Sequence, residues 1–494
     1  MLAIFRADAS RRVGSGHIMR CKTLADSLAT VGWHCGFAVG SGSPDLVPAL
    51  AESTHEIFTI TCDAADEAEM LSRRWPNGVD WLIVDHYQRD RRFETACRPW
   101  ARKIMVLDDL ADRPHDCDLL LDQTLDRKAE DYAEWSTPDC HLLLGTDYAL
   151  LRPEFRARRK DHPRPASPIQ RKLRVLVTLG GTDPDNMTET CLDALQQSGI
   201  SAEVDVVAGQ GFASLDRLRK RCESPEGFRL HVSPHNMGEL MAEADLSIGA
   251  AGTTSWERCC LGLPTIMLVL ADNQQENARQ LSAVGAVKVI DGDNADTARG
   301  IAEALKELDE DRASLHQMSN KAAALCDGQG SLRAILALLP EQPTRDGIGV
   351  QLRLAEAKDE AILLYWQQQP SIRALARNPA VPTEAEHRAW FWNRLRSENC
   401  FITLIEHGRD VAGMLRLDRL DTADRQGVFE VSIVVDDQHR GVGVGLAALR
   451  QIRVWMPDVE FRAETLPDNH PSIALFRSAG YRPFKDNLLH STAA

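Results

Sequence analysis

A histidine that follows a glycine-containing turn is the side chain of this sequence best placed for acid–base chemistry. Residues 13–20 read Val-Gly-Ser-Gly-His-Ile-Met-Arg. Gly14 and Gly16 let the backbone pass close to a ligand, and free N–H groups at the start of a helix attract negative charge. An imidazole with an ordinary pKa of about 6.5 is partly neutral at pH 7 and can accept a proton. His17 is therefore a candidate general base, and the simpler alternative is that it only begins a helix.

A second glycine-rich segment lies in the middle of the chain. Residues 249–254 read Gly-Ala-Ala-Gly-Thr-Thr, and Glu257 follows one helical turn later. Backbone N–H groups and hydroxyls that converge in such a loop suit a diphosphate. A carboxylate at this position could accept hydrogen bonds from both hydroxyls of a ribose. The alternative for Glu257 is a salt bridge to Arg258 or Arg279.

The elements that must position these segments form two successive α/β series. Strand-like apolar runs alternate with helical stretches up to about residue 155, and again from residue 173. The expected strands are 2–5, 33–39, 81–84, 103–107, 119–121 and 141–144, then 173–178, 202–207, 228–232, 246–248, 264–270 and 287–290. Such alternation predicts parallel sheets covered by helices, with ligands at the carboxyl ends of the strands. We therefore expect two Rossmann-type segments that face one another across a cleft.

Polar residues gather where these strands are expected to end. The first series contributes His17, Asp85, Tyr87 and the pair 108–109, and the second contributes Gly180, Gly181, Thr182, Gly252, Thr253, Thr254, Glu257, Asn273 and Gln274. Several clusters at strand ends are less expected by chance than one, so we predict a ligand site there. Asp183 and Asp185 are expected to be solvated turn residues.

Taken together, these motifs resemble the UDP-sugar hydrolases of pseudaminic acid biosynthesis, which are relatives of nucleotide-sugar glycosyltransferases with the GT-B architecture. The resemblance covers about residues 1–340 and is carried by segments 5–8, 14–21, 85–87, 143–155, 179–184, 252–257 and 271–274. It implies that His17 is the catalytic base, that Tyr87 and Asn273 line the sugar site, and that the loop with Glu257 holds UDP. Attack by water opposite UDP predicts inversion at C1. No metal ion is expected, because fixed dipoles can stabilise the leaving diphosphate.

Two proline-containing stretches divide the chain. Residues 156–172 are basic and lack periodicity, and residues 340–349 hold two prolines and two glycines. Both stretches are typical of linkers. The predicted domains are therefore residues 1–155, 172–340 and 350–494, and the last of these places two helices ahead of most of its strands.

A strand, a loop and a helix start follow one another at residues 431–446. This segment resembles the Arg-x-x-Gly-x-Gly acetyl-CoA loop of GNAT N-acetyltransferases, in which backbone N–H groups cradle a pyrophosphate. Residues 469–481 resemble the second signature of that family. The acetyl-CoA site implied by the resemblance comprises Val435, Arg440, Gly441, Val442, Gly443, Gly445, Leu446 and Asn469. A dinucleotide site is the rival interpretation, but its loop should follow the first strand of a βαβ unit.

Two carboxylates are candidates for removing the proton of an acetyl acceptor. Glu430 lies in the strand before the acetyl-CoA loop, Glu464 is the second choice, and either could be a surface carboxylate. Many GNAT enzymes have a tyrosine as the acid for the leaving thiolate where this chain has Phe476. Tyr481 could simply be packed, so the sequence does not identify the acid.

The composition is that of an ordinary globular chain. The 494 residues are 44% hydrophobic and 26% charged, and the formal net charge of −15 disfavours general binding to nucleic acid or to an anionic membrane. No apolar stretch approaches the roughly 20 residues that a spanning helix needs, so we expect a cytoplasmic protein. The 12 cysteines include no Cys-x-x-Cys pair, which argues against a zinc site or a disulfide framework.

The sequence thus predicts a bifunctional enzyme that uses a UDP-amino sugar and acetyl-CoA and releases UDP. We expect the third segment to acetylate a UDP-4-amino-4,6-dideoxy-hexosamine, and the first two to hydrolyse the resulting UDP-diacetamido-trideoxyhexose. The enzymatic alternatives are a glycosyltransferase and a hydrolysing 2-epimerase. From another class, the third segment could be an acetyl-CoA sensor or a protein acetylase.

Overall fold

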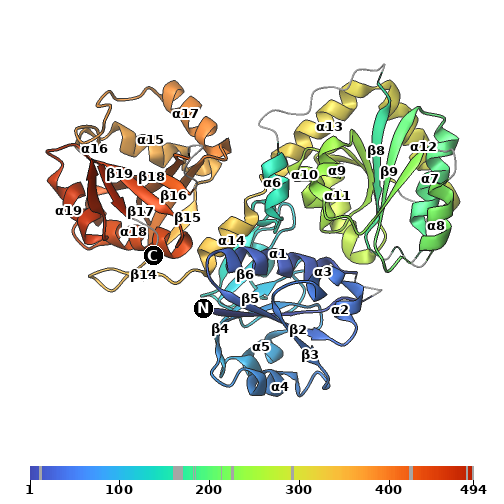
Figure 1. The fold of residues 1–494 in the computed structure, drawn as a ribbon, viewed down its shortest axis with the longest axis horizontal. Helices are drawn as coiled ribbons and strands as arrows, with labels where there is room; N and C mark the ends of the chain where they lie inside the picture. The colour runs from blue at the N-terminus through green and yellow to red at the C-terminus, as the bar shows by residue number, and fades with distance from the viewer. Residues whose placement is uncertain are drawn as a thin grey trace. The chain divides into compact units, whose positions relative to one another are not determined.

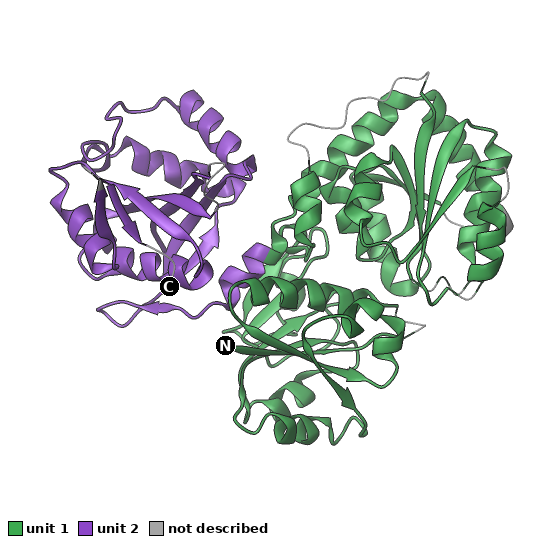
Figure 2. Ribbon diagram, viewed as in Figure 1, with its two compact units in different colours: residues 1–331 green, residues 332–494 purple. Residues whose placement is uncertain are grey.

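The computed structural model describes the chain apart from residues 11–13, 160–170, 182, 184, 213, 224–226, 291–293, 422–426, 486–487 and 492–494. The chain forms two compact units, residues 1–331 and 332–494 (Figure 2). The finer division into residues 1–155, 172–340 and 350–494 stays a prediction. In the described part of the chain, no helix is long and apolar enough to cross a membrane.

The first unit begins with a seven-stranded parallel sheet of order β3-β2-β1-β4-β5-β6-β7 (Figure 1). Its strands are β1 (Leu2–Ala7), β2 (His34–Gly40), β3 (Glu56–Ile60), β4 (Val79–Asp85), β5 (Ala101–Leu107), β6 (Leu119–Asp122) and β7 (His141–Leu144). The helical elements between and after them are α1 (Gly16–Thr30), α2 (Ser43–Leu46), α3 (Pro48–Ala51), α4 (Glu67–Arg74), α5 (Arg91–Cys97), η1 (Ala129–Tyr132), η2 (Thr146–Tyr148) and α6 (Pro153–Arg158). The strand order reverses between β1 and β4, so the ligand crevice of this sheet lies beyond the carboxyl ends of these two strands.

A six-stranded parallel sheet of order β10-β9-β8-β11-β12-β13 completes the first unit. Its strands are β8 (Leu173–Thr178), β9 (Ala202–Ala208), β10 (Phe228–Val232), β11 (Leu246–Ala250), β12 (Thr265–Leu268) and β13 (Val287–Ile290). Its helical elements are α7 (Met187–Ser198), α8 (Leu215–Cys222), α9 (Met237–Glu243), α10 (Thr254–Cys260), η3 (Asp272–Gln274), α11 (Gln275–Ala283), α12 (Asn294–Glu310), α13 (Arg312–Leu325) and α14 (Gly330–Leu338), the last of which continues into the second unit. The order of this sheet reverses between β8 and β11, which places its crevice at the loops after those strands.

The segment after β7 packs into the core of the second sheet. Leu151 and Phe155 are buried in one apolar cluster with Trp256, Cys260 and Met267. Each fully buried side chain of this size stabilises the packing by about 1.5–3 kcal/mol. This cluster therefore anchors the segment after β7 to the second sheet.

The second unit is built on an eight-stranded sheet of order β14-β15-β16-β17-β18-β19-β21-β20. Its strands are β14 (Gln342–Pro343), β15 (Gly349–Leu354), β16 (Cys400–His407), β17 (Asp410–Arg419), β18 (Val428–Val435), β19 (Glu460–Glu464), β20 (Arg482–Lys485) and β21 (Leu488–Ser491). Its helical elements are η4 (Ala357–Asp359), α15 (Glu360–Gln368), α16 (Pro370–Arg373), α17 (Glu384–Arg396), η5 (Asp437–His439), α18 (Val444–Trp455) and α19 (His470–Ser478). In Figure 1, α15 and α17 lie on one side of this sheet and α18 lies on the other.

Two neighbouring strands of this sheet separate part of the way along their length. The parallel pair β18 and β19 is in register only over residues 428–430 and 460–462, although β18 continues to Val435. Beyond Glu430, no described residue pairs with β18 on that side. The predicted fold class, an α/β chain with two Rossmann-type sheets followed by a smaller α/β domain, is confirmed.

Candidate active sites

Three glycine-containing loops of the first unit lie next to one another. A Cβ added to Gly16 would lie 3.4 Å from Thr253 Oγ1, and one added to Gly181 would lie 3.9 Å from Ser15 Oγ. The turn before α1 therefore lies against the loops that follow β8 and β11. Gly14 and Gly180 have φ values of +81° and +101°, which only glycine adopts without strain. Thr182 lies outside the described residues.

His17 is held by a buried carboxylate at the start of α1. Its Nδ1 lies 3.0 Å from Asp85 Oδ1, and the ring of Tyr87 meets the imidazole edge-on with centroids 4.5 Å apart. When Nδ1 carries the proton that Asp85 accepts, the neutral imidazole has its free lone pair on Nε2. Burial alone would lower the pKa of His17, but the Asp85 carboxylate outweighs burial and raises that pKa. The arrangement is that of a general base and the group that orients it.

Asp85 is buried inside the first unit, and the sequence had predicted it at the ligand site. We expected it to contact substrate, but it is completely buried, and the Arg20 guanidinium bonds both of its oxygens at 2.6 and 2.7 Å. Burial would raise the pKa of Asp85, and the charges of Arg20 and His17 reverse that effect and lower it. Asp85 is therefore a charged anchor for His17, with each of its oxygens already bonded to Arg20.

Tyr87 and Asn273 come together from the two sheets of the first unit. Asn273 Nδ2 donates to Tyr87 Oη at 2.9 Å, and Tyr87 Oη donates to Asp109 Oδ2 at 3.4 Å. Asp109 in turn accepts from Arg20 Nη1 at 3.1 Å. A chain of polar contacts thus runs from Arg20, which bonds the Asp85 carboxylate, to the turn that carries Asn273. Beside that turn, the side-chain oxygen of Gln274 accepts from the backbone N–H of Leu270 at 3.0 Å.

Glu257 pairs with neither arginine that the sequence suggested. The Arg152 guanidinium lies 3.5 Å from Glu257, whereas Arg279 pairs with Glu276 on α11. Burial raises the pKa of Glu257, and Arg152 opposes this rise only in part. The side chain is 17% exposed, so a ligand can still reach it. This geometry is compatible with a carboxylate that accepts from sugar hydroxyls.

Asp183 is not the solvated turn residue that we expected. It is 4% exposed, and its two carboxylate oxygens accept from the backbone N–H groups of Met187 and Thr188 at 2.9 and 2.8 Å. The residue is buried because its carboxylate satisfies N–H groups that the first turn of α7 leaves unpaired. Asp185 is exposed, as expected for a turn residue.

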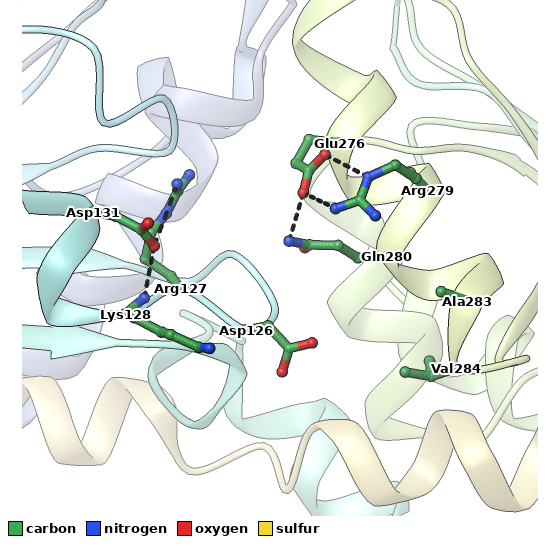
Figure 3. A pocket seen from close by; sticks show the side chains of 9 residues that line it. All are labelled: Asp126, Arg127, Lys128, Asp131, Glu276, Arg279, Gln280, Ala283 and Val284. Atoms are coloured by element: carbon green, nitrogen blue, oxygen red, sulfur yellow. Dashed lines mark hydrogen bonds and ion pairs between the residues drawn. The ribbon is translucent and has the colours of Figure 1, made fainter.

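A hollow of about 510 Å³ opens one turn beyond Asn273 (Figure 3). Its walls are Asp126, Arg127, Lys128 and Asp131 on one side and Glu276, Arg279, Gln280, Ala283 and Val284 on the other. None of the predicted site residues lines it. It connects with the cluster described above, because Arg127 Nη2 donates to the backbone carbonyl of Asp109 at 2.9 Å. Sequence reasoning missed these residues because a charge-dense stretch after a strand is usually solvated.

The second unit has a glycine loop at the end of β18. Gly441 and Gly443 have φ values of +86° and +102°, and Gly443 is the N-cap of α18. A Cβ added to Gly445 would lie 3.1 Å from a methyl group of Leu475, so α18 begins in close contact with α19. Val442 and Leu446 are partly exposed beside these glycines. The loop can present successive N–H groups to a pyrophosphate.

The polar side chains around this loop have defined partners. Arg440 folds back, with Nε 3.1 Å from the carbonyl oxygen of Val435 and Nη1 2.6 Å from Asp437. Asn469 caps α19, because its Oδ1 accepts from the backbone N–H of Ser472 at 3.1 Å.

One further arginine contacts the loop from a segment that the sequence analysis treated as a linker. The Arg345 backbone N–H donates to the carbonyl of Val442 at 2.8 Å, and Arg345 Nη1 lies 3.4 Å from that of Gly441. Its position in the chain, far ahead of the loop, gave no signal in the sequence.

The two candidate bases of the second unit share one arginine. Arg377 forms an ion pair with Glu430 and lies 2.9 Å from Glu464. Phe476 and Tyr481 are both buried, with ring centroids 5.0 Å apart, and burial raises the pKa of Tyr481. In the described part of the chain the hydroxyl of Tyr481 has no hydrogen-bond partner. The structure therefore places both carboxylates together and Tyr481 inside the core.

Comparison with known families defines the class of this chain. Residues 174–330 match the glycosyltransferase family 28 C-terminal domain, and residues 363–481 match the acetyltransferase (GNAT) family. The chain is therefore a fusion of a glycosyltransferase-like part with a GNAT acetyltransferase domain. The described residues include no group of three His, Cys, Asp or Glu side chains placed to hold a metal ion.

Individual relatives narrow the classification of the N-terminal part. The chain is 26% identical over 291 residues to the UDP-2,4-diacetamido-2,4,6-trideoxy-beta-L-altropyranose hydrolase of Campylobacter jejuni. The aligned region covers 58% of this chain and 97% of that protein. It is also 22% identical over 493 residues to an uncharacterized protein of Methanocaldococcus jannaschii, and that alignment covers 97% of this chain and 96% of the other protein. The crystal structure of MurG from Acinetobacter baumannii superposes with a TM-score of 0.46 at 16% identity, over 68% of this chain and 99% of that one. The N-terminal part is thus homologous to the hydrolase, and both predicted resemblances are confirmed.

Proposed function

We propose that this chain carries out two consecutive reactions on a nucleotide-linked amino sugar. The second unit transfers the acetyl group of acetyl-CoA to the amine of a UDP-4-amino-4,6-dideoxy-hexosamine. The first unit then hydrolyses the UDP-diacetamido-trideoxyhexose to UDP and free sugar. The GNAT match and the homology to a UDP-sugar hydrolase support the two halves of this proposal.

The observation that carries the hydrolytic step is the His17 cluster beside two glycine loops. With Asp85 on Nδ1, the neutral imidazole can take a proton from water at Nε2. The water oxygen bonds to C1 from the face opposite UDP, the C1–O bond breaks, and the electron pair leaves with the diphosphate. The configuration at C1 is inverted. We assign the diphosphate to Gly180, Gly181, Gly252 and Thr253 and the sugar to Tyr87 and Asn273, and the closeness of these residues to one another supports the assignment.

In the acetyl transfer, the amine nitrogen bonds to the thioester carbonyl and the C–S bond breaks. Glu430 accepts the amine proton, directly or through water, once the acceptor has displaced Arg377 from it. The thiolate of CoA takes up a proton from solvent, because Phe476 has none to give and Tyr481 is buried. The glycine loop at the end of β18 suits the pyrophosphate of acetyl-CoA, since a Cβ on Gly441 would meet nothing within 4 Å and the backbone there is open to close approach.

The experiment that tests this proposal is product analysis by NMR. The full chain is incubated with acetyl-CoA and a panel of UDP-4-amino sugars that differ in configuration. We expect UDP, CoA and a free diacetamido sugar, with the first-formed anomer inverted relative to the substrate. Release of UDP only when an acceptor alcohol is added, with the sugar bonded to that alcohol, would indicate a glycosyltransferase, and a product changed at C2 would indicate a 2-epimerase.

A further inference from the structure

Arg258 carries a positive charge that is buried beneath the glycine loop of the first unit. The residue is 1% exposed, whereas residues 252–254 above it are partly exposed. Its Nη2 donates to the carbonyl of Ala250 at 2.5 Å and to Ser255 Oγ at 3.1 Å. Its Nη1 lies 3.5 Å from Thr254 Oγ1. The guanidinium is thus bonded to the underside of the loop.

Among the described residues this charge has no direct ion-pair partner, and the neighbouring Glu257 carboxylate acts on it only through space. The acceptors of Arg258 are all neutral oxygens, and among the described residues no carboxylate forms an ion pair with it and its Nε has no hydrogen-bond partner. Its sequence neighbour Glu257 pairs with Arg152 instead. Burial lowers the pKa of Arg258 to about 10, so the side chain is still charged at neutral pH. A buried charge without a direct ion-pair partner costs stability, and such charges are often found at functional sites.

The fold makes room for this guanidinium at one particular residue. A Cβ added to Gly249, near the end of β11, would lie 2.1 Å from Arg258 Nη1 and 3.2 Å from the carbonyl oxygen of Thr178. Any side chain at this position would displace the arginine. The guanidinium therefore fills the space that the missing side chain of Gly249 leaves, and it is bonded there to the carbonyl of Ala250.

We propose that Arg258 is the built-in counter-charge for the diphosphate of the nucleotide bound by this loop. The inference rests on the proposed function, because it takes UDP as the ligand. The diphosphate lies on the exposed side of residues 252–254, and Arg258 acts on it from the buried side as a positioning residue. Thr254 connects the two, since a hydroxyl that accepts from the guanidinium can donate its own proton to a phosphate oxygen.

The location explains why burial is useful in this role. A charge in a low-dielectric interior acts more strongly over a few ångströms than one in water and is screened less by salt. As the C1–O bond breaks, the negative charge on the diphosphate grows. A fixed cation beneath the loop stabilises that charge without having to reorganise.

The test compares UDP and uridine as ligands of the full chain carrying Arg258→Met, which keeps the length of the side chain and removes its charge. UDP is titrated by calorimetry, and uridine is followed by saturation-transfer NMR. We expect UDP affinity to fall by about tenfold to a hundredfold, which is the range for losing a charge-assisted contact, while uridine affinity stays the same. Arg258→Lys should retain most of the UDP affinity. Arg299→Met, the same change at an exposed position on α12, is the matched control and should bind UDP normally.

A second readout separates a functional charge from a structural one. Without ligand, the Arg258→Met chain should melt at the same temperature as the wild type or higher, and the rise in melting temperature caused by UDP should be smaller. If this variant does not fold, Thr254→Val tests the same path at a partly exposed position, and UDP affinity should fall severalfold.

Several results would overturn the inference. UDP affinity of Arg258→Met within about twofold of the wild type would do so, and so would equal losses of UDP and uridine binding, because the arginine would then only shape the loop. Unchanged UDP affinity in Thr254→Val would remove the proposed connection. A wild-type chain that does not bind UDP would contradict the proposed function itself, so the two failures are distinguishable.

Discussion

The glycine loops at residues 249–254 and 441–443 each precede a helix, but they differ in where the nearest positive charge lies. Below residues 249–254 the charge belongs to Arg258, which is 1% exposed and bonded to neutral oxygens. Beside Gly441–Gly443 the arginines are at the surface, and the side chain of Arg440 is 44% exposed and paired with Asp437. Arg345 approaches the same loop from the β14–β15 turn and is also exposed.

This difference indicates how much anion binding by each loop depends on the charge of a nearby arginine. A buried charge is hardly screened, and it adds to the binding of an anion at any ionic strength. Exposed arginines are screened by salt and contribute little each. We therefore expect the first loop to depend on one side chain, and the second to depend mainly on its backbone conformation.

Replacing His17 should cause the largest difference between the activities of the two units. His17→Gln should lower hydrolysis by about two to four orders of magnitude, because it removes a positioned base, and should leave UDP binding and acetyl transfer intact. Steady-state UDP release and acetyl transfer are measured on the same preparation. Near-normal UDP release by the folded variant would contradict the assignment of His17.

Gly443→Val should have the converse effect. The position has a φ of +102°, which a β-branched residue does not adopt without strain, and its Cβ would reach 3.8 Å from Arg345. We expect acetyl-CoA binding to fall by at least about tenfold in calorimetry, with hydrolysis of a diacetamido substrate unchanged.

Gly427→Val is the matched control, since Gly427 also has a positive φ but lies before β18 with nothing within 4 Å of an added Cβ. Both variants should lose some stability. Equal acetyl-CoA affinity in the two variants would show that the loop at Gly443 does not hold the cosubstrate.

The pH dependence of hydrolysis should show how Asp85 acts on His17. Because Asp85 raises the pKa of His17, kcat/KM should fall about tenfold per pH unit below a midpoint that lies above the ordinary value of about 6.5. Asp85→Asn should move this midpoint to lower pH. A wild-type midpoint at or below 6.5, unchanged by the substitution, would show that the carboxylate does not hold the proton on His17.

The smallest expected effect concerns Arg345. Arg345→Ala should weaken acetyl-CoA binding by about threefold at low salt and less at 0.5 M salt, because an exposed cation is screened. UDP binding by the same variant should not change. An equal loss at both salt concentrations would show that Arg345 acts through the packing of the β14–β15 turn and not through its charge.

The parallel sheets were predictable because their inner strands are buried on both faces. β1, β4, β8 and β11 are almost entirely buried and read as continuous apolar runs. β3 was missed because Glu56 and Thr59 interrupt its apolar pattern. β15 could have been found, since Val350, Leu352 and Leu354 alternate with polar residues.

The loops of the site were predictable, but the roles of several charged residues in it were not. Strand ends located His17, Tyr87 and Asn273, because the carboxyl ends of parallel strands lie at one edge. The burial of Asp85 and Arg258 depends on partners supplied by the fold. Arg20 is far from Asp85 in the sequence, and Arg258 has room only because Gly249 lacks a side chain.

The order of the two reactions tests the bifunctional account most directly. A hydrolytic pocket that accepts a 4-acetamido group should bind a 4-ammonium group poorly, since the charge would lose its hydration. Timed chromatography of the full chain with acetyl-CoA and a UDP-2-acetamido-4-amino-trideoxy hexose should show CoA first and UDP second, with almost no UDP when acetyl-CoA is omitted. Comparable UDP release without acetyl-CoA would contradict the account, because the first unit would then be indifferent to the product of the second.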